Sequence, residues 1–434
     1  MLQCCKPIEE ITTDKFVLLR FDQDTVSFDT VFAGQLSISR KLKVYNTSDN
    51  AISISSIRLA GMENSFFSLI INGLQTNQTN NLFLRGKDSL FILTNVTLDQ
   101  NDKTLPFLVA DSIIFITNAN EQKVYLESYG QNANYYNGDT IKSNTTWDST
   151  KAQFIKKTVF VAKEATLTIE KGTKLYFVKG AGMKIAGSLQ VKGDSGKIVA
   201  FQGPRLDADY RNLPGLWQGI EFLPTAKNNM IDYAEIKNAV NGIVIGDTNN
   251  LLNGNLKITN TVIKNMSGYG LQAHNVNLTA WNCVVYNCAY NGFLLSGKGD
   301  YRCYNNTFAF TFSDFTRFGA ALEIKDGERS LQLVNNIIWG SGYTGTELVF
   351  SKQSTDIFNK NLVRHADKLL TADTSNFWNT NPKFVSENGG NLNFSLDSLS
   401  PAVGKAVKLI EFTNDIKGKN RGDKWDIGAY QFSK

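Results

Sequence analysis

The stretch 236–245 reads Ile-Lys-Asn-Ala-Val-Asn-Gly-Ile-Val-Ile: an apolar strand that ends in Asn, followed by an apolar strand that begins with Gly. The same order of residues returns at 263–273 and at 285–295. A repeat of about 22–30 residues is typical of solenoid proteins, in which each unit buries its apolar face only by stacking on its neighbours. A third apolar run follows each pair, as at 256–258. The pattern therefore predicts a parallel β-helix.

Residues at equal positions of successive repeats form columns, and these columns predict what holds the coils together. Amides stacked in one column can hydrogen-bond to one another and so satisfy buried polar groups. We expect such an internal ladder at Asn238, Asn265 and Asn287. A tight corner with φ values that favour glycine is expected at Gly242, Gly270, Gly292, Gly319 and Gly345. Each coil is expected to close at Asn260, Asn282, Asn306, Asn336 and Asn361.

The chain divides into four segments. Residues 1–14 are expected to form an N-terminal tether. Residues 15–131 alternate apolar and polar residues in about seven short runs, which is typical of an immunoglobulin-like β-sandwich, although no Cys-Trp-Cys core pins it. Residues 132–148, rich in Asn, Gly, Thr and Tyr, indicate a linker. The β-helix and a C-terminal capping segment are expected at 149–434.

The composition argues against several classes of protein. With 45 Lys and Arg against 40 Asp and Glu, the 434-residue chain lacks the charge excess of a nucleic-acid binder. No stretch approaches the roughly 18 apolar residues that span a bilayer. The histidines His274 and His365 are isolated, which argues against catalytic triads and two-His metal sites. We therefore expect no nucleic acid, no metal and no cofactor.

Three of the five cysteines lie in the repeats, at Cys283, Cys288 and Cys303. They lack the CxxC pairs of a zinc site, so we expect them to be small buried apolar residues. A disulfide between Cys283 and Cys303 is the alternative.

The other two cysteines stand near the N-terminus, where Leu2-Gln3-Cys4-Cys5 resembles the end of a bacterial lipoprotein signal. The resemblance implies a covalent lipid anchor at Cys4 or Cys5 that holds the protein to a membrane it does not cross. The next residues, Lys6–Glu10, are similar to the signal that sends lipoproteins of Bacteroidota-type bacteria to the cell surface. The alternative is an ordinary disordered terminus that contains two cysteines.

Motifs along most of the chain carry a second resemblance. They are Asp22–Phe32, Leu42–Asn46, Asp111–Ser112, Tyr129–Gln131, Gly203–Leu206 and Pro214–Gly219. Together they resemble a family of β-helix lipoproteins found in Bacteroidota. The final segment is similar to the closing motif of bacterial β-helix surface proteins of the pectate-lyase-like superfamily, through Ser400–Ala402, Asp415, Gly418, Arg421 and Asp426–Tyr430. The resemblance implies a right-handed parallel β-helix at the outer membrane, and it transfers no catalytic residues.

Glycan cleavage on such a fold requires particular side chains, and the outward-facing columns can be searched for them. Hydrolysis of a glycan needs two carboxylates that flank the bond, and no outward column contains an acid pair. Asp232 and Glu235 lie on one coil but are expected on opposite faces. Eliminative cleavage of a uronic acid could use Lys237 and Lys264 as base and charge neutraliser, with Tyr286 beside them. The alternative is a solvated face whose basic side chains keep it soluble.

The most unusual non-repeating stretch is 205–211, Arg-Leu-Asp-Ala-Asp-Tyr-Arg, which Trp217 follows. Aromatic faces stack on sugar rings, and Asp and Arg bind hydroxyls or carboxylates. A carbohydrate-binding platform could therefore be formed by Arg205, Asp207, Asp209, Tyr210, Arg211 and Trp217. Alternatively, the loop folds back and Trp217 packs on the sheet.

These observations predict a non-enzymatic lipoprotein of the bacterial outer membrane, exposed at the cell surface. Solenoids offer long flat surfaces, so the β-helix is expected to bind a glycan or an outer-membrane protein complex, and the sandwich to act as a spacer or docking module. The alternative is a polysaccharide lyase or glycoside hydrolase that acts on an acidic glycan in a groove of the β-helix.

Overall fold

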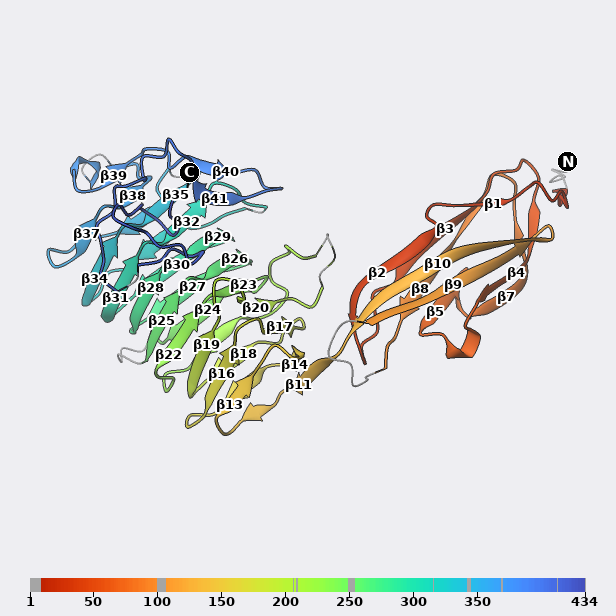
Figure 1. Ribbon diagram of the computed structural model, residues 1–434, viewed down its shortest axis with the longest axis horizontal. Helices are drawn as coiled ribbons and strands as arrows, with labels where there is room; N and C mark the ends of the chain where they lie inside the picture. Colours follow the sequence, from red (N-terminus) through yellow and green to blue (C-terminus); the bar gives the residue numbers. More distant parts are fainter. Residues whose placement is uncertain are drawn as a thin grey trace, which may run out of the picture. The chain divides into compact units, whose positions relative to one another are not determined.

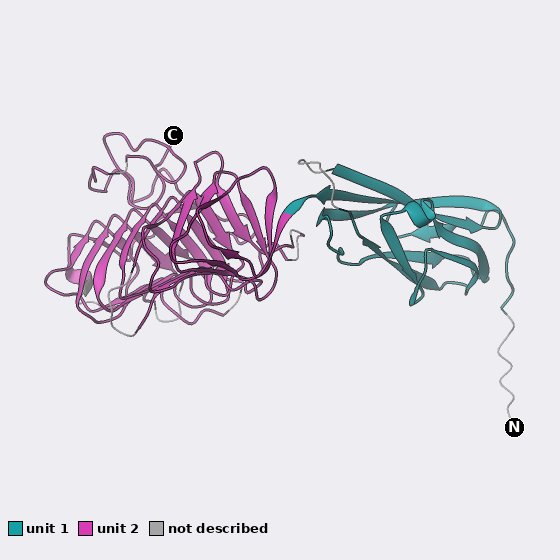
Figure 2. Ribbon diagram, turned by 90° about the horizontal axis from the view of Figure 1, so that it is seen from below, with its two compact units in different colours: residues 1–133 teal, residues 134–434 magenta. Residues whose placement is uncertain are grey.

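The computed structural model describes residues 9–99, 107–205, 207, 210–248, 254–314, 316–341, 345–367, 370–411 and 413–433. The chain forms two compact units, residues 1–133 and residues 134–434 (Figure 2). In the described residues every regular element is a β-strand except two short 3-10 turns, η1 (Met62–Asn64) and η2 (Leu370–Ala372). None of these residues forms a helix with the length and apolarity needed to cross a membrane.

The first unit is a β-sandwich of two five-stranded sheets. In spatial order, one sheet contains β1 (Leu19–Phe21), β3 (Arg40–Asn46), β8 (Ser89–Val96), β5 (Phe67–Ile71) and β6 (Leu74–Gln75). The other contains β2 (Thr25–Phe32), β10 (Asn120–Gln131), β9 (Phe107–Thr117), β4 (Ile52–Leu59) and β7 (Gln78–Leu84). Alternate residues such as Val26, Phe28, Val124 and Leu126 are buried in the core of this unit. The predicted sandwich is confirmed, and its immunoglobulin-like character stays a prediction.

The second unit is built on three long parallel sheets, numbered here by chain order (Figure 1). Sheet 1 contains β11 (Ala133–Asn137), β14 (Ala152–Lys157), β17 (Lys174–Phe177), β20 (Val199–Gln202), β23 (Ala234–Lys237), β26 (Val262–Met266), β29 (Val284–Cys288), β32 (Thr307–Phe310), β35 (Ile337–Gly340), β38 (Leu362–Val363) and β39 (Phe377–Trp378). Sheet 2 contains β12 (Thr140–Ile141), β15 (Val159–Val161), β18 (Met183–Ile185), β21 (Ile220–Phe222), β24 (Ile243–Gly246), β27 (Leu271–His274), β30 (Phe293–Ser296), β33 (Leu322–Ile324) and β36 (Leu348–Phe350). Sheet 3 contains β13 (Thr145–Trp147), β16 (Thr166–Glu170), β19 (Ser188–Lys192), β22 (Asn229–Asp232), β25 (Asn255–Thr259), β28 (Asn277–Trp281), β31 (Gly299–Tyr304), β34 (Arg329–Val334) and β37 (Ile357–Asn359). The predicted parallel β-helix is confirmed.

Apart from the last strand of each sheet, every strand pairs with the strand one coil further along the chain. Ile236 of β23 lies beside Ile263 of β26, which lies beside Val285 of β29. All three side chains are fully buried in a single core that runs between the sheets. Since side chains alternate along a strand, the residues between them point outward, and this decides which side chains can form a surface site.

The segment 132–148, expected as a linker, instead forms the first coil. It contributes β11, β12 and β13, and the latter two pair in parallel with β15 and β16. Its composition suggested a turn-rich linker, but Ile141 and Trp147 are buried because the second coil covers them. Tertiary stacking therefore overrides the local turn signals.

The asparagine columns are confirmed in part. Asn287 donates to Asn265 at 2.7 Å, whereas Asn238 donates to the carbonyl oxygens of Arg211 and Leu213 instead of continuing that ladder. The expected column of coil-closing asparagines is in fact two neighbouring columns. Asn260 and Asn282 belong to one, at positive φ, together with Asn305 and Asn335. The other forms a buried amide ladder of 2.9–3.0 Å hydrogen bonds through Asn306, Asn336, Asn361 and Asn376.

The glycine column has a different cause from the one expected. Gly242, Gly270 and Gly292 stand directly before β24, β27 and β30, and none of them has a positive φ. A Cβ on Gly270 would collide with the carbonyl oxygen of Gly292, because the coils approach closely there. In the next two coils this position holds Ala321 and Glu347, so Gly319 and Gly345 lie outside the column.

The C-terminal segment folds back over the outer face of sheet 1. It includes the hairpin of β40 (Phe384–Ser386) and β41 (Asn393–Leu396), and its apolar side chains pack on Val284, Ile337 and Leu362. Arg421 from the closing motif is buried, and it donates to Asn282 Oδ1 at 2.7 Å and to the carbonyl oxygen of Gly428 at 3.0 Å. The C-terminal segment thereby covers part of sheet 1 between β29 and β38.

The cysteines of the repeats, Cys283, Cys288 and Cys303, are free and buried. The disulfide considered between Cys283 and Cys303 is therefore not formed. Burial raises the pKa of Cys283 and of Cys288 to about 12, so both thiols stay protonated and unreactive at neutral pH.

We expect Asn336→Ala to lower the free energy of unfolding of the β-helix by about 3 kcal/mol, because it removes the side-chain hydrogen bonds to Asn306 and Asn361 and leaves the buried backbone N–H of Asn306 without its partner, Asn336 Oδ1. All six tryptophans lie in the second unit, so tryptophan fluorescence during urea unfolding reports on this unit alone. The control Gln272→Ala, on the outer face of sheet 2, should change stability by less than about 0.5 kcal/mol. Equal effects of the two variants would contradict a structural role for the ladder.

Candidate functional site

Four side chains on the outer face of sheet 1 form one cluster, which we call the charged seam: Glu235 and Lys237 from β23, Lys264 from β26 and Tyr286 from β29. Glu235 lies between the lysines, with Oε2 2.8 Å from Lys264 Nζ and Oε1 3.3 Å from Lys237 Nζ. The three charged side chains are only 18–21% exposed. The sequence analysis placed Lys237, Lys264 and Tyr286 in one column correctly. It missed Glu235, although a residue two positions before Lys237 must share its face.

The electrostatics of the charged seam keep its groups in their ordinary ionisation states. Burial alone would lower the pKa of Lys264, but the neighbouring Glu235 and Tyr286 outweigh it and raise this pKa. Burial alone would raise the pKa of Glu235, but Lys264 and Lys237 outweigh it and lower this pKa. Burial raises the pKa of Tyr286. At neutral pH the cluster therefore contains two ammonium groups, one carboxylate and a neutral phenol.

Two chain segments border the charged seam. On one side, the ring of Tyr286 meets Phe394 of the C-terminal segment edge-on, with centroids 5.0 Å apart. On the other side, Asn238 holds the excursion 203–216 through the carbonyl oxygens of Arg211 and Leu213, at 3.1 and 2.7 Å. The charged seam thus lies on sheet 1 between these two segments.

The described residues of the excursion contact one another. Arg205 Nε lies 3.0 Å from Asp207 Oδ2, and its guanidinium lies over the ring of Tyr210 at 3.0 Å from the centroid. The backbone N–H groups of Tyr210 and Arg211 donate to the carbonyl oxygen of Asp207. Asp209 lies outside the described residues. Among the residues that are described, no ion pair joins this turn to the charged seam, so the two parts of the predicted site are neighbours without direct pairing.

Trp217 does not belong to a surface platform. Its side chain is 0% exposed, its ring stacks on Phe177 at 4.1 Å, and its Nε1 donates to the carbonyl oxygen of Lys237 at 2.8 Å. The alternative, that the loop folds back and Trp217 packs on the sheet, is therefore correct, and the indole packs on the inner side of the coil. The excursion has already returned to the coil when the chain reaches Trp217, which makes the indole part of the core and unavailable to a ligand.

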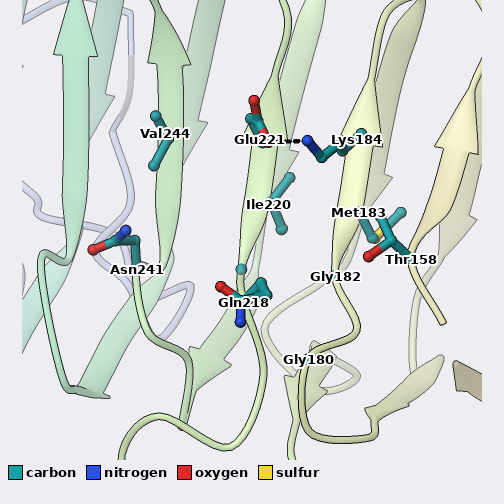
Figure 3. A pocket seen from close by; sticks show the side chains of 11 residues that line it. Thr158, Gly180, Gly182, Met183, Lys184, Gln218, Ile220, Glu221, Asn241 and Val244 are labelled. Atoms are coloured by element: carbon teal, nitrogen blue, oxygen red, sulfur yellow. Dashed lines mark ion pairs between the residues drawn. The ribbon is translucent and has the colours of Figure 1, made fainter. Parts of the chain in front are cut away.

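A pocket of about 360 Å³ opens on sheet 2, and the sequence analysis did not predict it. Lys184 of β18 and Glu221 of β21 face each other across neighbouring strands, with Nζ and Oε2 3.1 Å apart (Figure 3). The pocket, called the sheet-2 pocket below, is lined by Thr158, Gly180, Gly182, Met183, Lys184, Gln218, Gly219, Ile220, Glu221, Asn241 and Val244. Glycines line part of this pocket, and neighbouring coils approach closely there, since a Cβ on Gly182 would lie 2.9 Å from the carbonyl oxygen of Gly219. The signal in the sequence was opposite charges at equal positions of successive coils.

An aromatic row begins one coil above the sheet-2 pocket. The N–H of Tyr269 donates to Asn241 Oδ1 at 3.0 Å, and Asn241 lines the pocket. The ring of Tyr269 stacks on Tyr290 at 5.1 Å, and Tyr290 lies 5.4 Å from Phe318 in the next coil. Tyr290 is 41% and Phe318 68% exposed. Exposed aromatic side chains in a continuous row are unusual on a solvated surface and mark a surface suited to contact a ligand.

Neither location has the groups that a metal centre requires. In the described part of the chain, no three His, Cys, Asp or Glu residues lie close enough together to hold a metal ion. The lining of the sheet-2 pocket includes one carboxylate, Glu221. Cys4 and Cys5, the predicted lipid attachment sites, lie outside the described residues.

Residues 135–308 match the family described as right handed beta helix region. The match lies within the second unit and agrees with its three parallel sheets. A comparison with curated proteins finds no match.

Solved structures show only a weak similarity. The VesB protease of Vibrio cholerae is 13% identical over 26% of this chain and 31% of that chain, with a TM-score of 0.19. A protein of unknown function from Porphyromonas gingivalis W83 is 10% identical over 28% and 59%, with a TM-score of 0.21. The PapD-like domain of human CEP192 is 7% identical over 31% and 99%, with a TM-score of 0.20. The chain covers less than two thirds of the first two, and none of the three carries an argument about function.

The charged seam generates a pH-dependent stability. Because the pKa of Glu235 lies below its ordinary value of 4.5, the ionised carboxylate stabilises the fold above that pH, and this contribution is lost as the pH falls through the folded-state pKa. We expect Glu235→Gln to lower the free energy of unfolding by about 1–3 kcal/mol at pH 7. The difference from the wild type should shrink as the pH falls below 4.5, as measured by urea unfolding. Glu164→Gln, at an exposed glutamate, is the control, and a pH-independent effect of Glu235→Gln would contradict this account.

Proposed function

We propose that this protein is a non-enzymatic glycan-binding protein and that the sheet-2 pocket holds the sugar. The observation that carries the proposal is the lining of this pocket. It offers the amides of Gln218 and Asn241, the hydroxyl of Thr158 and the Lys184–Glu221 pair around a floor of glycine backbone. Its volume of about 360 Å³ lies in the range of small-molecule sites.

The chemistry of the lining selects the ligand. A sugar hydroxyl both donates and accepts hydrogen bonds, and amides, a hydroxyl, an ammonium and a carboxylate together provide both kinds of partner. The charges of Lys184 and Glu221 cancel, so the pocket has no preference for a charged ligand. The aromatic row of Tyr269, Tyr290 and Phe318 leads away from the pocket coil by coil and offers apolar contact for the C–H faces of further sugars. A chain of neutral sugars therefore fits this face better than an isolated anion does.

Binding fits the geometry better than cleavage. Hydrolysis needs an acid and a second carboxylate on either side of the bond, and Glu221 is the one carboxylate in the described lining of the sheet-2 pocket. Elimination needs a base, but Lys264 in the charged seam has a raised pKa and stays protonated. Glu235 is held as a carboxylate and cannot serve as an acid. The lyase and hydrolase alternatives therefore receive no support from these groups.

The test is to fill the sheet-2 pocket. Thr158→Trp should reduce the affinity for a bound neutral oligosaccharide at least about tenfold, because the indole would occupy the space of the sugar. A panel of neutral and acidic oligosaccharides is screened by isothermal titration calorimetry, and the reaction mixtures are checked for new reducing or unsaturated ends. Thr168→Trp, on the outer face of sheet 3, is the matched control and should bind like the wild type. Product formation, or unchanged binding by Thr158→Trp, would refute the proposal.

We also propose that an acyl chain on Cys4 or Cys5 anchors the protein to the outer membrane, facing the cell surface. The support is the resemblance of Leu2–Cys5 to a lipoprotein signal. Cells that express the full-length protein should incorporate labelled palmitate, and Cys4→Ser combined with Cys5→Ser should abolish the label and release the protein from membranes. Persistent labelling of the double variant would reject both sites.

A further inference from the structure

The charged seam contains more positive than negative charge. Lys237 and Lys264 share the single carboxylate of Glu235, at 3.3 and 2.8 Å. Among the described residues, neither lysine has a second acid within ion-pair distance. The cluster therefore holds one uncompensated positive charge.

This excess positive charge lies in a partly buried environment. The three charged side chains are 18–21% exposed, so they are largely removed from water but keep some contact with it. An unpaired charge in such surroundings is unfavourable, and it attracts an ion of opposite sign more strongly than a fully solvated lysine does. The Glu235 carboxylate alone does not remove this imbalance.

The charged seam also contains hydrogen-bond donors that its own carboxylate does not use. Each lysine ammonium has three N–H donors, and Glu235 accepts from each ammonium with one oxygen. Tyr286 lies beside Lys264, whose Nζ is 5.9 Å from the centre of the phenol ring, and a phenol O–H can donate a hydrogen bond. Two ammonium groups and a phenol close together on one sheet face are suited to bind the oxygens of an anion.

We infer that the charged seam is a binding site for an oxyanion, such as the carboxylate of a uronic acid or a sulfate group. This site is separate from the sheet-2 pocket, because it lies on sheet 1 and its net charge selects an anionic ligand. The shared chemistry is a negatively charged oxygen group held by Lys237, Lys264 and Tyr286. Such a group reaches the seam either on a sugar or as a free inorganic ion.

Two variants that change the charge in opposite directions test this inference. Lys237→Met makes the cluster neutral and should weaken the binding of sodium glucuronate at least about tenfold. Glu235→Gln raises the net charge by one and should tighten the same binding several-fold. Binding is measured by calorimetry at constant ionic strength, with glucose as the neutral probe and sodium sulfate as the inorganic one.

The outcomes are distinct. Opposite shifts with glucuronate support an oxyanion site that accepts a sugar, and opposite shifts with sulfate alone support the site and assign it to an inorganic ion. Absence of binding to the wild type, or shifts in the same direction, overturns the inference. Lys257→Met, on sheet 3, is the matched control for a general loss of positive charge, and circular dichroism verifies folding. If Glu235→Gln does not fold, the comparison of Lys237→Met with the wild type and with Lys257→Met decides. None of these variants changes the sheet-2 pocket, so failure here leaves the proposed glycan site to its own test.

Discussion

The structure of the second unit depends on one constraint: each coil must lie on the next in register, so that like side chains meet. The buried ladder of Asn306, Asn336, Asn361 and Asn376 expresses this constraint most directly, because each side-chain amide in it is hydrogen-bonded to the asparagine of a neighbouring coil. The glycines before the strands of sheet 2 serve the same purpose sterically. A shift of one residue would leave the amides buried without partners and turn the apolar side chains outward.

The same register creates the surface chemistry. Lys184 meets Glu221 because the two residues occupy equal positions in successive coils, and Lys264 lies above Lys237 for the same reason. In the first case opposite charges neutralise each other in an open pocket. In the second case the two lysines lie side by side, and Glu235, from the same strand as Lys237, forms ion pairs with both. A repeated backbone with varied outward residues thus produces two sites of different electrostatic character.

Sheet 1 and sheet 2 differ in how far other segments of the chain cover them. The C-terminal segment and the excursion at 203–216 border the middle of sheet 1, and the closing motif is locked to the coils by the buried Arg421. Arg421 contacts Asn282, which is 139 positions away in the sequence. The three charged side chains of the charged seam are only 18–21% exposed, whereas a pocket of about 360 Å³ and an exposed aromatic row remain accessible on sheet 2. The two sites therefore differ in burial as well as in the residues that form them.

The sequence by itself determined the β-helix, the β-sandwich and the shared column of Lys237, Lys264 and Tyr286, because strand periodicity and repeat spacing are local properties of the chain. It missed that residues 132–148 form a coil and that Trp217 is buried, since both depend on the coil that packs against them. Glu235 could have been added from the two-residue alternation alone. The sheet-2 pocket and the cover over sheet 1 arise from contacts between residues far apart in the chain. Their shape and burial depend on three-dimensional packing, so only the tertiary structure decided them.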